Sequence, residues 1–450
     1  MGVNRRSFIK YASMAAAGNA AALRPFGALN ALAQGTTGYK ALVCIFLFGG
    51  NDANNTLVPF DTAGYANYAK IRGPLAIPQT GTGALLQLGG MPNFALNPNL
   101  PDIAALFNSN NVALVTNVGT LTEPTTKAQY LAAGTTLPTN LFSHPDQQLE
   151  WQNASQSGAT STGWAGRIAD QLNSAYNSGA QVPMITSVAG DTLFCNGGAS
   201  TPVSVSPGNL GAAQCSEGTT ECGAQLATAQ ALLSFNSGLT LVQADNSITT
   251  NAYSYAKTLS AAVQSVTPLK TVFPTANGLA SQLQQIAQII QVRAALGVSR
   301  QIFFCGVGNF DTHSNQLALQ NLLLSQISPA MAAFYAATVE MGVQSSVTSF
   351  TMSDFSRTFQ PNSNTGSDHA WGAHHMVMGG AVKGGQMYGT FPTLTLGGPD
   401  DSGTNGRWVP STGSVQYAAT LASWFGVSAA QMPLVFPNIG SFASSNLGFV

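Results

Sequence analysis

Short, almost unbroken runs of apolar residues recur along the chain. Five of them are rich in β-branched residues and predict strands at 41–48, 112–117, 184–188, 301–307 and 347–352. The runs are continuously apolar and do not alternate with polar residues, which is typical of strands buried on both faces of a parallel sheet.

Between these runs, apolar residues repeat at every third or fourth position. This spacing predicts helices at 163–176, 279–296, 315–341 and 414–425. Ser161 and Thr162 are candidate N-caps for the first helix, and Pro329 should break or kink the third. Alternation of strands and helices predicts an α/β fold, a three-layer sandwich with a largely parallel central sheet.

One stretch, at about 192–220, breaks this alternation because it is rich in Ser, Gly, Pro and Thr. We interpret it as an excursion from a single domain that spans 34–450, with no internal repeat. Cys215 and Cys222 flank a polar loop in this region and could form a small disulfide, with Cys195 as the odd thiol or an alternative partner. Cys44 and Cys305 lie in predicted strands and should be buried thiols.

The N-terminal segment has the parts of a cleavable twin-arginine export signal. Arg5 and Arg6 precede a short Ala-rich apolar stretch, and Ala31-Leu32-Ala33 supplies a cleavage site. The stretch is too short to span about 30 Å of hydrocarbon, which argues against a membrane anchor. We therefore expect residues 1–33 to be a signal peptide, the twin-arginine translocase to be a partner during export, and the mature protein to be periplasmic or secreted without a stable membrane anchor.

Charged residues make up only 7% of the chain, with 16 Lys and Arg against 17 Asp and Glu. Loss of the signal peptide would remove four basic residues and leave 12 basic and 17 acidic ones, a net charge of −5. No basic patch is available to displace counterions from phosphates, so we expect no nucleic-acid partner.

Because charges are scarce, the positions of the titratable residues are informative. Asp52, Asp311 and Asp354 each follow a predicted strand. Four of the five histidines, His313, His369, His374 and His375, lie in the motifs that end or follow the predicted strands, and the fifth is His144, in Ser143-His144. Ligands of open α/β sheets bind beyond the carboxyl ends of the strands. Carboxylates gathered there would repel one another unless divalent cations compensated them, and imidazole with carboxylate suits Zn or Mn, or Mg and Ca with more oxygen ligands.

Each of these residues also has a structural interpretation. Asp52 could cap a helix or brace a turn, and Asp311-Thr312-His313 could form a turn. Arg357 could pair with a core carboxylate. Adjacent histidines on a strand face opposite ways, so at most one of His374 and His375 should point into a given site.

Several motifs together resemble a known family. Phe-Gly-Gly-Asn-Asp at 48–52, Phe-Asp-Thr-His at 310–313, Ser-Asp-Phe-x-Arg-Thr at 353–358 and Asp-His at 368–369 resemble the bacterial domain-of-unknown-function 1501 family. The resemblance runs from about 40 to 436. The family is similar to the alkaline phosphatase/sulfatase superfamily, which implies an alkaline-phosphatase-like sheet with divalent metals at the strand ends.

The resemblance implies roles for particular residues. The implied metal ligands are Asp52, Asp311, His313 and Asp354, with His369 or one of His374 and His375 supplying the last histidine. A nucleophile is implied at a helix N-terminus in the segment that holds Thr139, Asn140, Ser143 and His144, and Arg357 is a possible anion clamp. Two departures stand out: Phe355 replaces the histidine of a Ser-Asp-His motif, and the Cys-x-Pro-x-Arg sulfatase signature is missing.

Two functions follow as hypotheses. The first is an exported hydrolase of phosphate or sulfate esters, on a small molecule or a polysaccharide, that uses divalent metal ions (Zn, Mn, Mg or Ca). The alternative is a non-catalytic exported surface or polysaccharide-binding protein on a hydrolase-like scaffold, which the low charge of the surface and the uncertain nucleophile favour.

Overall fold

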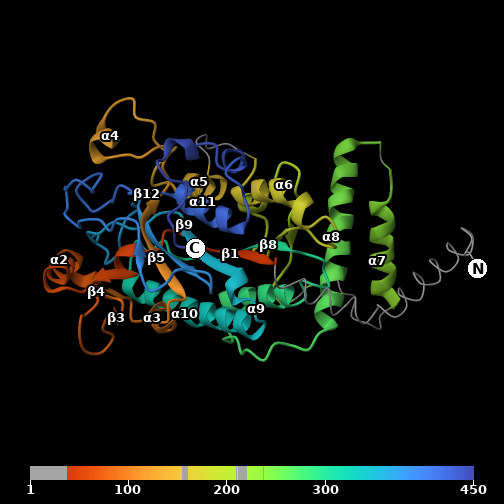
Figure 1. Ribbon diagram of the computed structural model, residues 1–450, viewed down its shortest axis with the longest axis horizontal. Helices are drawn as coiled ribbons and strands as arrows, with labels where there is room; N and C mark the ends of the chain where they lie inside the picture. The colour runs from red at the N-terminus through yellow and green to blue at the C-terminus, as the bar shows by residue number, and fades with distance from the viewer. Residues whose placement is uncertain (1–37, 155–160, 209, 211–219, 237) are drawn as a thin grey trace, which may run out of the picture.

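A mixed, mostly parallel sheet forms the centre of the computed structural model, which describes residues 38–154, 161–208, 210, 220–236 and 238–450 (Figure 1). The strand order is β11-β5-β10-β9-β1-β8-β6-β7, with β12 paired to β5. The strands are β1 (Lys40–Leu47), β5 (Val112–Gly119), β6 (Ile185–Ser187), β7 (Val203–Ser204), β8 (Arg300–Val307), β9 (Val347–Ser353), β10 (Ala373–Met378), β11 (Met387–Tyr388) and β12 (Thr412–Gly413).

All five predicted strands are present, at β1, β5, β6, β8 and β9. The strand β1 lies between β8 and β9 and is parallel to both. The unpredicted strand β10 runs antiparallel to β9 and β5. It is short and carries His374 and His375, so its sequence did not show the apolar run of a buried strand.

Both faces of the sheet are buried, as the continuous apolar runs predicted. Along β1, Val43 and Ile45 pack into one hydrophobic cluster, and Cys44 and Phe46 into another on the opposite face. Figure 1 shows the helices as two layers on either side of the sheet, which confirms the α/β sandwich. One layer holds α3 (Pro101–Asn108), α9 (Gly278–Gln291) and α10 (Gln316–Glu340), and the other holds α5 (His144–Asn153), α6 (Trp164–Tyr176), α11 (Ser414–Phe425) and α12 (Met432–Val435).

The helix α10 continues through Pro329, so of the two predicted outcomes, a break or a kink, the break is wrong. A proline removes one backbone hydrogen bond, but the buried residues of α10 pack against α3 and α9 along its length, and this packing keeps the helix in one piece. Among the described residues α10 is also long and apolar enough to cross a membrane, although half of its most apolar window is buried inside the protein. The cap of α6 differs from the prediction as well, because Gly163 occupies the N-cap position.

Smaller elements flank the sandwich. A second sheet has the order β2-β4-β3, from β2 (Leu57–Pro59), β3 (Leu86–Leu88) and β4 (Met91–Leu96), and beside it lie α2 (Thr62–Arg72) and η2 (Gly73–Leu75). A hairpin of α7 (Thr220–Leu233) and α8 (Thr240–Gln264) stands at one end of the molecule (Figure 1). The remaining elements are η1 (Ala53–Asn55), α4 (Lys127–Leu131), η3 (Leu193–Cys195), η4 (Gln344–Ser346) and η5 (Ile439–Ser441).

Two predictions concern residues at least partly outside the described chain. The proposed signal peptide lies entirely outside it. The proposed Cys215–Cys222 disulfide also cannot be compared with the structure, because Cys215 and the side chain of Cys222 lie outside the described residues. By contrast, Cys44, Cys195 and Cys305 are buried free thiols, as expected for Cys44 and Cys305.

The register of the three central strands brings their carboxyl ends together, because Leu47 pairs with both Val307 and Ser353. Directly after β1, the turn at Gly49 passes against the backbone of the segment that follows β8. The φ angle of Gly49 is +109°, and a Cβ atom at this position would lie 2.5 Å from the nitrogen of Asp311. Only glycine allows both this conformation and this approach.

We therefore expect Gly49→Ala to destabilise the protein by about 2–4 kcal/mol, from the positive φ angle and the clash together. Urea unfolding of the variant measures this loss. Gly278→Ala is the matched control, because Gly278 lies at the start of α9 with ordinary φ and open space around its Cβ position. Equal stability of the two variants would contradict the close approach at Gly49.

Candidate functional site

Three histidines and one aspartate converge beyond the carboxyl ends of β1, β8 and β9. The Oδ1 atom of Asp311 lies 3.1 Å from Nε2 of His313 and 3.4 Å from Nε2 of both His144 and His369. The Nε2 atoms of His313 and His369 are 2.9 Å apart. Ligand atoms of His144, Asp311 and His369 all lie within 4.8 Å of one another. We call these four residues the histidine cluster.

The four residues come from three distant parts of the chain. Asp311 and His313 lie in the loop between β8 and α10, and His144 is the first residue of α5. His369 lies after the loop that follows β9, in a two-residue antiparallel bridge with Arg357. The bridge fixes His369 against the segment that leaves the central sheet, so the tertiary fold assembles the cluster.

In each histidine of the cluster, the second ring nitrogen has a partner of its own. Nδ1 of His144 lies 2.7 Å from Oδ2 of Asp354, and Nδ1 of His313 lies 3.1 Å from Oδ1 of Asp368. Nδ1 of His369 lies 2.6 Å from the backbone oxygen of Phe142. With protons on Nδ1, all three Nε2 atoms would present lone pairs to the centre of the cluster, as metal-binding histidines do.

Burial and neighbouring groups shift the pKa values of the cluster residues. The hydrogen bond that His144 donates to Asp354 raises the pKa of His144, whereas burial lowers the pKa of His369. Partial burial alone would raise the pKa of Asp311, but hydrogen bonding and the charge of Arg357 hold it below its usual value. The Asp311 side chain is 46% exposed, so this carboxylate is ionised and accessible from solvent.

Asp354 supports the cluster from behind. Its side chain is fully buried, and it accepts hydrogen bonds from the backbone nitrogen of Gly49 at 3.1 Å and from Gln148 at 2.8 Å, besides its contact with His144. This placement differs from the expected metal ligand, because both carboxylate oxygens are already occupied. Asp354 orients His144.

Arg357 is a buried guanidinium at the base of the cluster. It donates to Oδ1 of Asp311 at 2.8 Å and to the backbone oxygen of Ser367 at 2.7 Å, and its side chain has no exposure. Burial lowers its pKa. The expected anion clamp is therefore corrected: Arg357 is fully buried, both of its terminal nitrogens donate to protein oxygens, and it holds Asp311 in place.

Asp52 lies outside the cluster. Its buried carboxylate forms an ion pair with Arg72 and accepts hydrogen bonds from Gln316 and from the backbone nitrogen of Asn54. It caps η1. The expected metal ligand is thus corrected, since both oxygens of this carboxylate accept hydrogen bonds from protein groups and Asp52 braces the turn after β1.

His374 and His375 are also elsewhere. His375 lies in the hydrophobic layer between Trp151 and Tyr417, and burial lowers its pKa to about 3. His374 accepts a hydrogen bond from the nitrogen of Asn117, and burial lowers its pKa to about 4. The expectation that His375 binds a metal is corrected, because strand β10 turns both rings into the core.

The segment before α5 lies against the cluster. Phe142 has a φ angle of +73°, which is costly for a bulky residue, and its carbonyl is the partner of His369. Arg407 holds it there, with its guanidinium 4.6 Å from the Phe142 ring and its Nε donating to the oxygen of His369. Ser143 is the N-cap of α5, but its hydroxyl donates to Asp146 at 2.6 Å.

Thr139 is exposed and lies farther along this segment. Its backbone nitrogen donates to Glu150, and within the described part of the chain its hydroxyl forms no hydrogen bond with the histidine cluster. Asn140 has a φ angle of +45° and forms part of the same irregular turn. Of the two predicted hydroxyl nucleophiles, only Ser143 is next to the cluster in the sequence. It follows Phe142, whose carbonyl contacts His369, and precedes His144, a member of the cluster.

Several partners of the cluster were not predicted as such. The Nδ1 atoms of His313 and His369 are held by Asp368 and by the carbonyl of Phe142. Gln148 donates to Asp354, the carboxylate behind His144. The spacing of His144 and Gln148, one helical turn apart, is a signal that could have pointed to a shared partner. The carbonyl of Phe142 carried no signal in the sequence, since any residue supplies one.

Glu150 anchors the segment that carries Ser143. This buried carboxylate accepts hydrogen bonds from the nitrogen of Thr139 at 2.7 Å and from Gln147 at 3.2 Å. Burial raises its pKa from 4.5 to about 7. A raised pKa favours the protonated form in the folded state, so the stability from this group is full below about pH 4.5 and is lost as the pH rises through about 7.

Glu150→Gln should therefore stabilise the protein by about 1–3 kcal/mol at about pH 8 and change little at about pH 4.5, because the amide keeps an acceptor for Thr139 without a buried charge. Urea unfolding at the two pH values measures the difference. The same free-energy change at both pH values would contradict a carboxyl that titrates between them.

Comparisons with known proteins place the chain in a family. A search of curated proteins gave no match. Among solved structures, Ps i-CgsB shares 10% identity, with TM-scores of 0.35 alone and 0.33 in complex with k-i-k-neocarrahexaose, over 89% of this chain and 77% of that one. A mutant of alkaline phosphatase PafA shares 11% identity at a TM-score of 0.27, over 71% of this chain and 63% of that one.

The family model described as "Protein of unknown function (DUF1501)" matches residues 39–401, a range that includes the whole histidine cluster. This confirms the family expected from the motifs. The chain belongs to the DUF1501 family.

Proposed function

We propose that this protein is an exported, metal-dependent hydrolase of phosphate or sulfate esters whose reaction centre is the histidine cluster. The observation that carries the proposal is the convergence of three imidazole Nε2 atoms on one oxygen of Asp311, each ring being held from behind by its own partner. Metal-binding histidines almost always donate their other ring N–H to a carboxylate or a backbone carbonyl, and these three histidines each have such a partner.

The donor set favours one class of metal. His144, His313, His369 and Asp311 would offer three nitrogens and one carboxylate, a combination suited to Zn²⁺ or Mn²⁺ and poor for Mg²⁺ or Ca²⁺, which prefer oxygen. The Nε2 atom of His144 is buried and makes no hydrogen bond within the described chain. Such an unsatisfied nitrogen costs free energy unless it binds a ligand.

A divalent ion held by these residues would supply Lewis-acid stabilisation to the ester oxygens. The protein's own groups then position the reaction. Arg357 fixes Asp311, Asp354 fixes His144, and Asp368 fixes His313, so the cluster is organised before a substrate binds. The half-exposed Asp311 and His313 form its open side.

Ser143 is the hydroxyl that we propose as the nucleophile. It stands at the N-terminus of a ten-residue helix, between Phe142 and His144, and its proton is already directed to Oδ2 of Asp146. Attack of Oγ on phosphorus or sulfur would form a bond to Oγ and break the bond to the ester oxygen; Asp146 would accept the serine proton, and the departing oxygen would leave as the alcohol with a proton from water. A second water would then hydrolyse the phosphoryl- or sulfuryl-serine, which releases phosphate or sulfate and restores Ser143. The helix N-terminus favours the negative charge that develops there.

We expect the wild-type chain to bind Zn²⁺ and to hydrolyse p-nitrophenyl phosphate or p-nitrophenyl sulfate. Asp311→Asn should abolish both properties. Asp354→Asn should weaken metal affinity by about 10–100-fold, because it removes the partner that orients His144. Ser143→Ala should keep the metal and lower turnover by about 10²-fold or more. Equilibrium dialysis with elemental analysis measures binding, and release of nitrophenol measures turnover.

Asp400→Asn is the matched control, because this carboxylate lies outside the cluster, where it accepts from the nitrogen of Thr393. It should behave as the wild type in both assays. Equal metal binding by Asp311→Asn and the wild type would overturn the metal site. Metal binding without hydrolysis of either ester would instead favour a non-catalytic binding protein on this scaffold.

Export by the twin-arginine translocase, and a periplasmic or secreted location, are supported by the paired arginines and the Ala31-Leu32-Ala33 site. We expect the double change Arg5→Lys and Arg6→Lys to retain the chain in the cytoplasm of a bacterial host. Fractionation with an antibody against a C-terminal tag would show this. Unchanged export of the double variant would contradict the proposal.

A further inference from the structure

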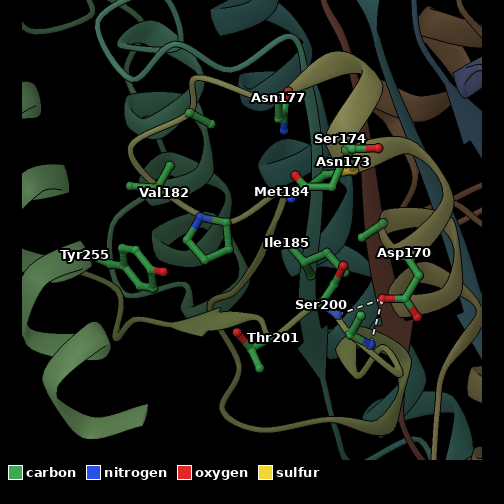
Figure 2. A pocket seen from close by; sticks show the side chains of 14 residues that line it. Asp170, Asn173, Ser174, Asn177, Val182, Met184, Ile185, Ser200, Thr201 and Tyr255 are labelled. Carbon is green, nitrogen blue, oxygen red and sulfur yellow. Dashed lines mark hydrogen bonds between the residues drawn. The ribbon is translucent and has the colours of Figure 1, made fainter. Parts of the chain in front are cut away.

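A cavity lies far from the histidine cluster. It has a volume of about 380 Å³ and is lined by α6, by the segment that leads into β6, by residues 199–201 and by Tyr255 of α8 (Figure 2). This volume falls in the usual range of small-molecule sites, about 300–1,000 Å³.

This cavity lies at the opposite end of the strands from the cluster. Its lining includes Val182, which precedes β6, and Ile185, the first residue of β6. It also includes Asn177, whose side chain donates to the oxygen of Arg300 at the start of β8. Since β6 and β8 are parallel, these are the amino ends of the strands, whereas Asp311 follows the carboxyl end of β8. The cavity is therefore independent of the proposed hydrolase site.

Polar groups with free hydrogen-bonding capacity line the cavity. The side chains of Asn173, Ser174 and Thr201 are exposed and form no hydrogen bond within the described chain. Figure 2 shows Tyr255 across the cavity from Asp170, with its hydroxyl directed inward. The Tyr255 ring packs against the main hydrophobic cluster, so it is held in place before any ligand arrives.

The cavity is poorly suited to an anion. Among the residues that the structure describes, no Lys or Arg lines it, and Asp170 is the one charged residue of its lining. The Asp170 carboxylate accepts hydrogen bonds from the backbone nitrogens of Gly198 and Ser200, both at 2.7 Å, and of Ala199 at 3.1 Å. These backbone donors compensate the charge of Asp170. The carboxylate oxygens can still accept further hydrogen bonds, such as those from hydroxyl groups.

We propose that this cavity is a binding subsite for a neutral sugar unit. An aromatic ring beside aliphatic side chains fits the apolar face of a pyranose, and the amide, hydroxyl and carboxylate groups match its hydroxyls. Tyr255 is the central contact. Asn173 and Asp170 bind the hydroxyls, and a sulfated or phosphorylated unit is disfavoured by the carboxylate.

Binding of maltohexaose and of cellohexaose to the full chain tests this inference, with saturation-transfer NMR to detect contact and calorimetry to measure affinity. At least one of these neutral probes should bind. Tyr255→Ala should weaken that binding by about tenfold or more. Tyr253→Ala is the matched control, because Tyr253 lies on the same helix but does not line the cavity, and it should bind as the wild type does.

Asn173→Ala provides a second variant on an exposed helix position, so the inference stays testable if Tyr255→Ala does not fold; it too should weaken binding. Binding of neither probe, wild-type affinity in both cavity variants, or equal or tighter binding of sulfated maltohexaose would each overturn the inference. Loss of metal from Asp311→Asn should leave sugar binding unchanged, which separates this site from the proposed hydrolase site.

Discussion

The buried guanidinium of Arg357 holds together the segments from which the histidine cluster is built. It reaches Asp311 after β8, the carbonyl of Ser367 before His369 and, at 3.4 Å, the carbonyl of Gly49 after β1. A buried cation is costly unless acceptors surround it. These three segments are therefore coupled, since each supplies an acceptor to the same buried guanidinium and Asp311 supplies the compensating charge.

Exposure separates the carboxylates of this region into two groups. Asp52 and Asp354 are buried and have both oxygens engaged by protein donors, so they stabilise the turn after β1 and the position of His144. Asp311 and Asp368 are about half exposed. Of these two, Asp368 faces the outer nitrogen of His313, and only Asp311 faces the inner nitrogens. One aspartate among four is thus placed to share a ligand with the three histidines.

The two candidate sites differ in the chemistry they can support. The cluster concentrates imidazole and carboxylate at the carboxyl ends of the strands, where open sheets generally bind their ligands. The cavity at the amino ends is lined by uncharged groups and a locally compensated aspartate. Although charges are scarce in this chain, three of its five histidines and several of its aspartates lie in one small region.

The sequence by itself determined the five central strands, the helices between them and the family, because continuous apolar runs and three-to-four spacing depend on local composition. It also predicted that acidic and imidazole side chains lie together at the strand ends, since parallel strands present their carboxyl ends on one edge of the sheet. Only the tertiary structure decided which residues meet. Sequence spacing could not show that Arg72 forms an ion pair with Asp52 or that α5 brings His144 to Asp311, because these contacts join residues 20 to more than 160 positions apart. Nor could it show that β10 buries His375, since this depends on how the layers pack.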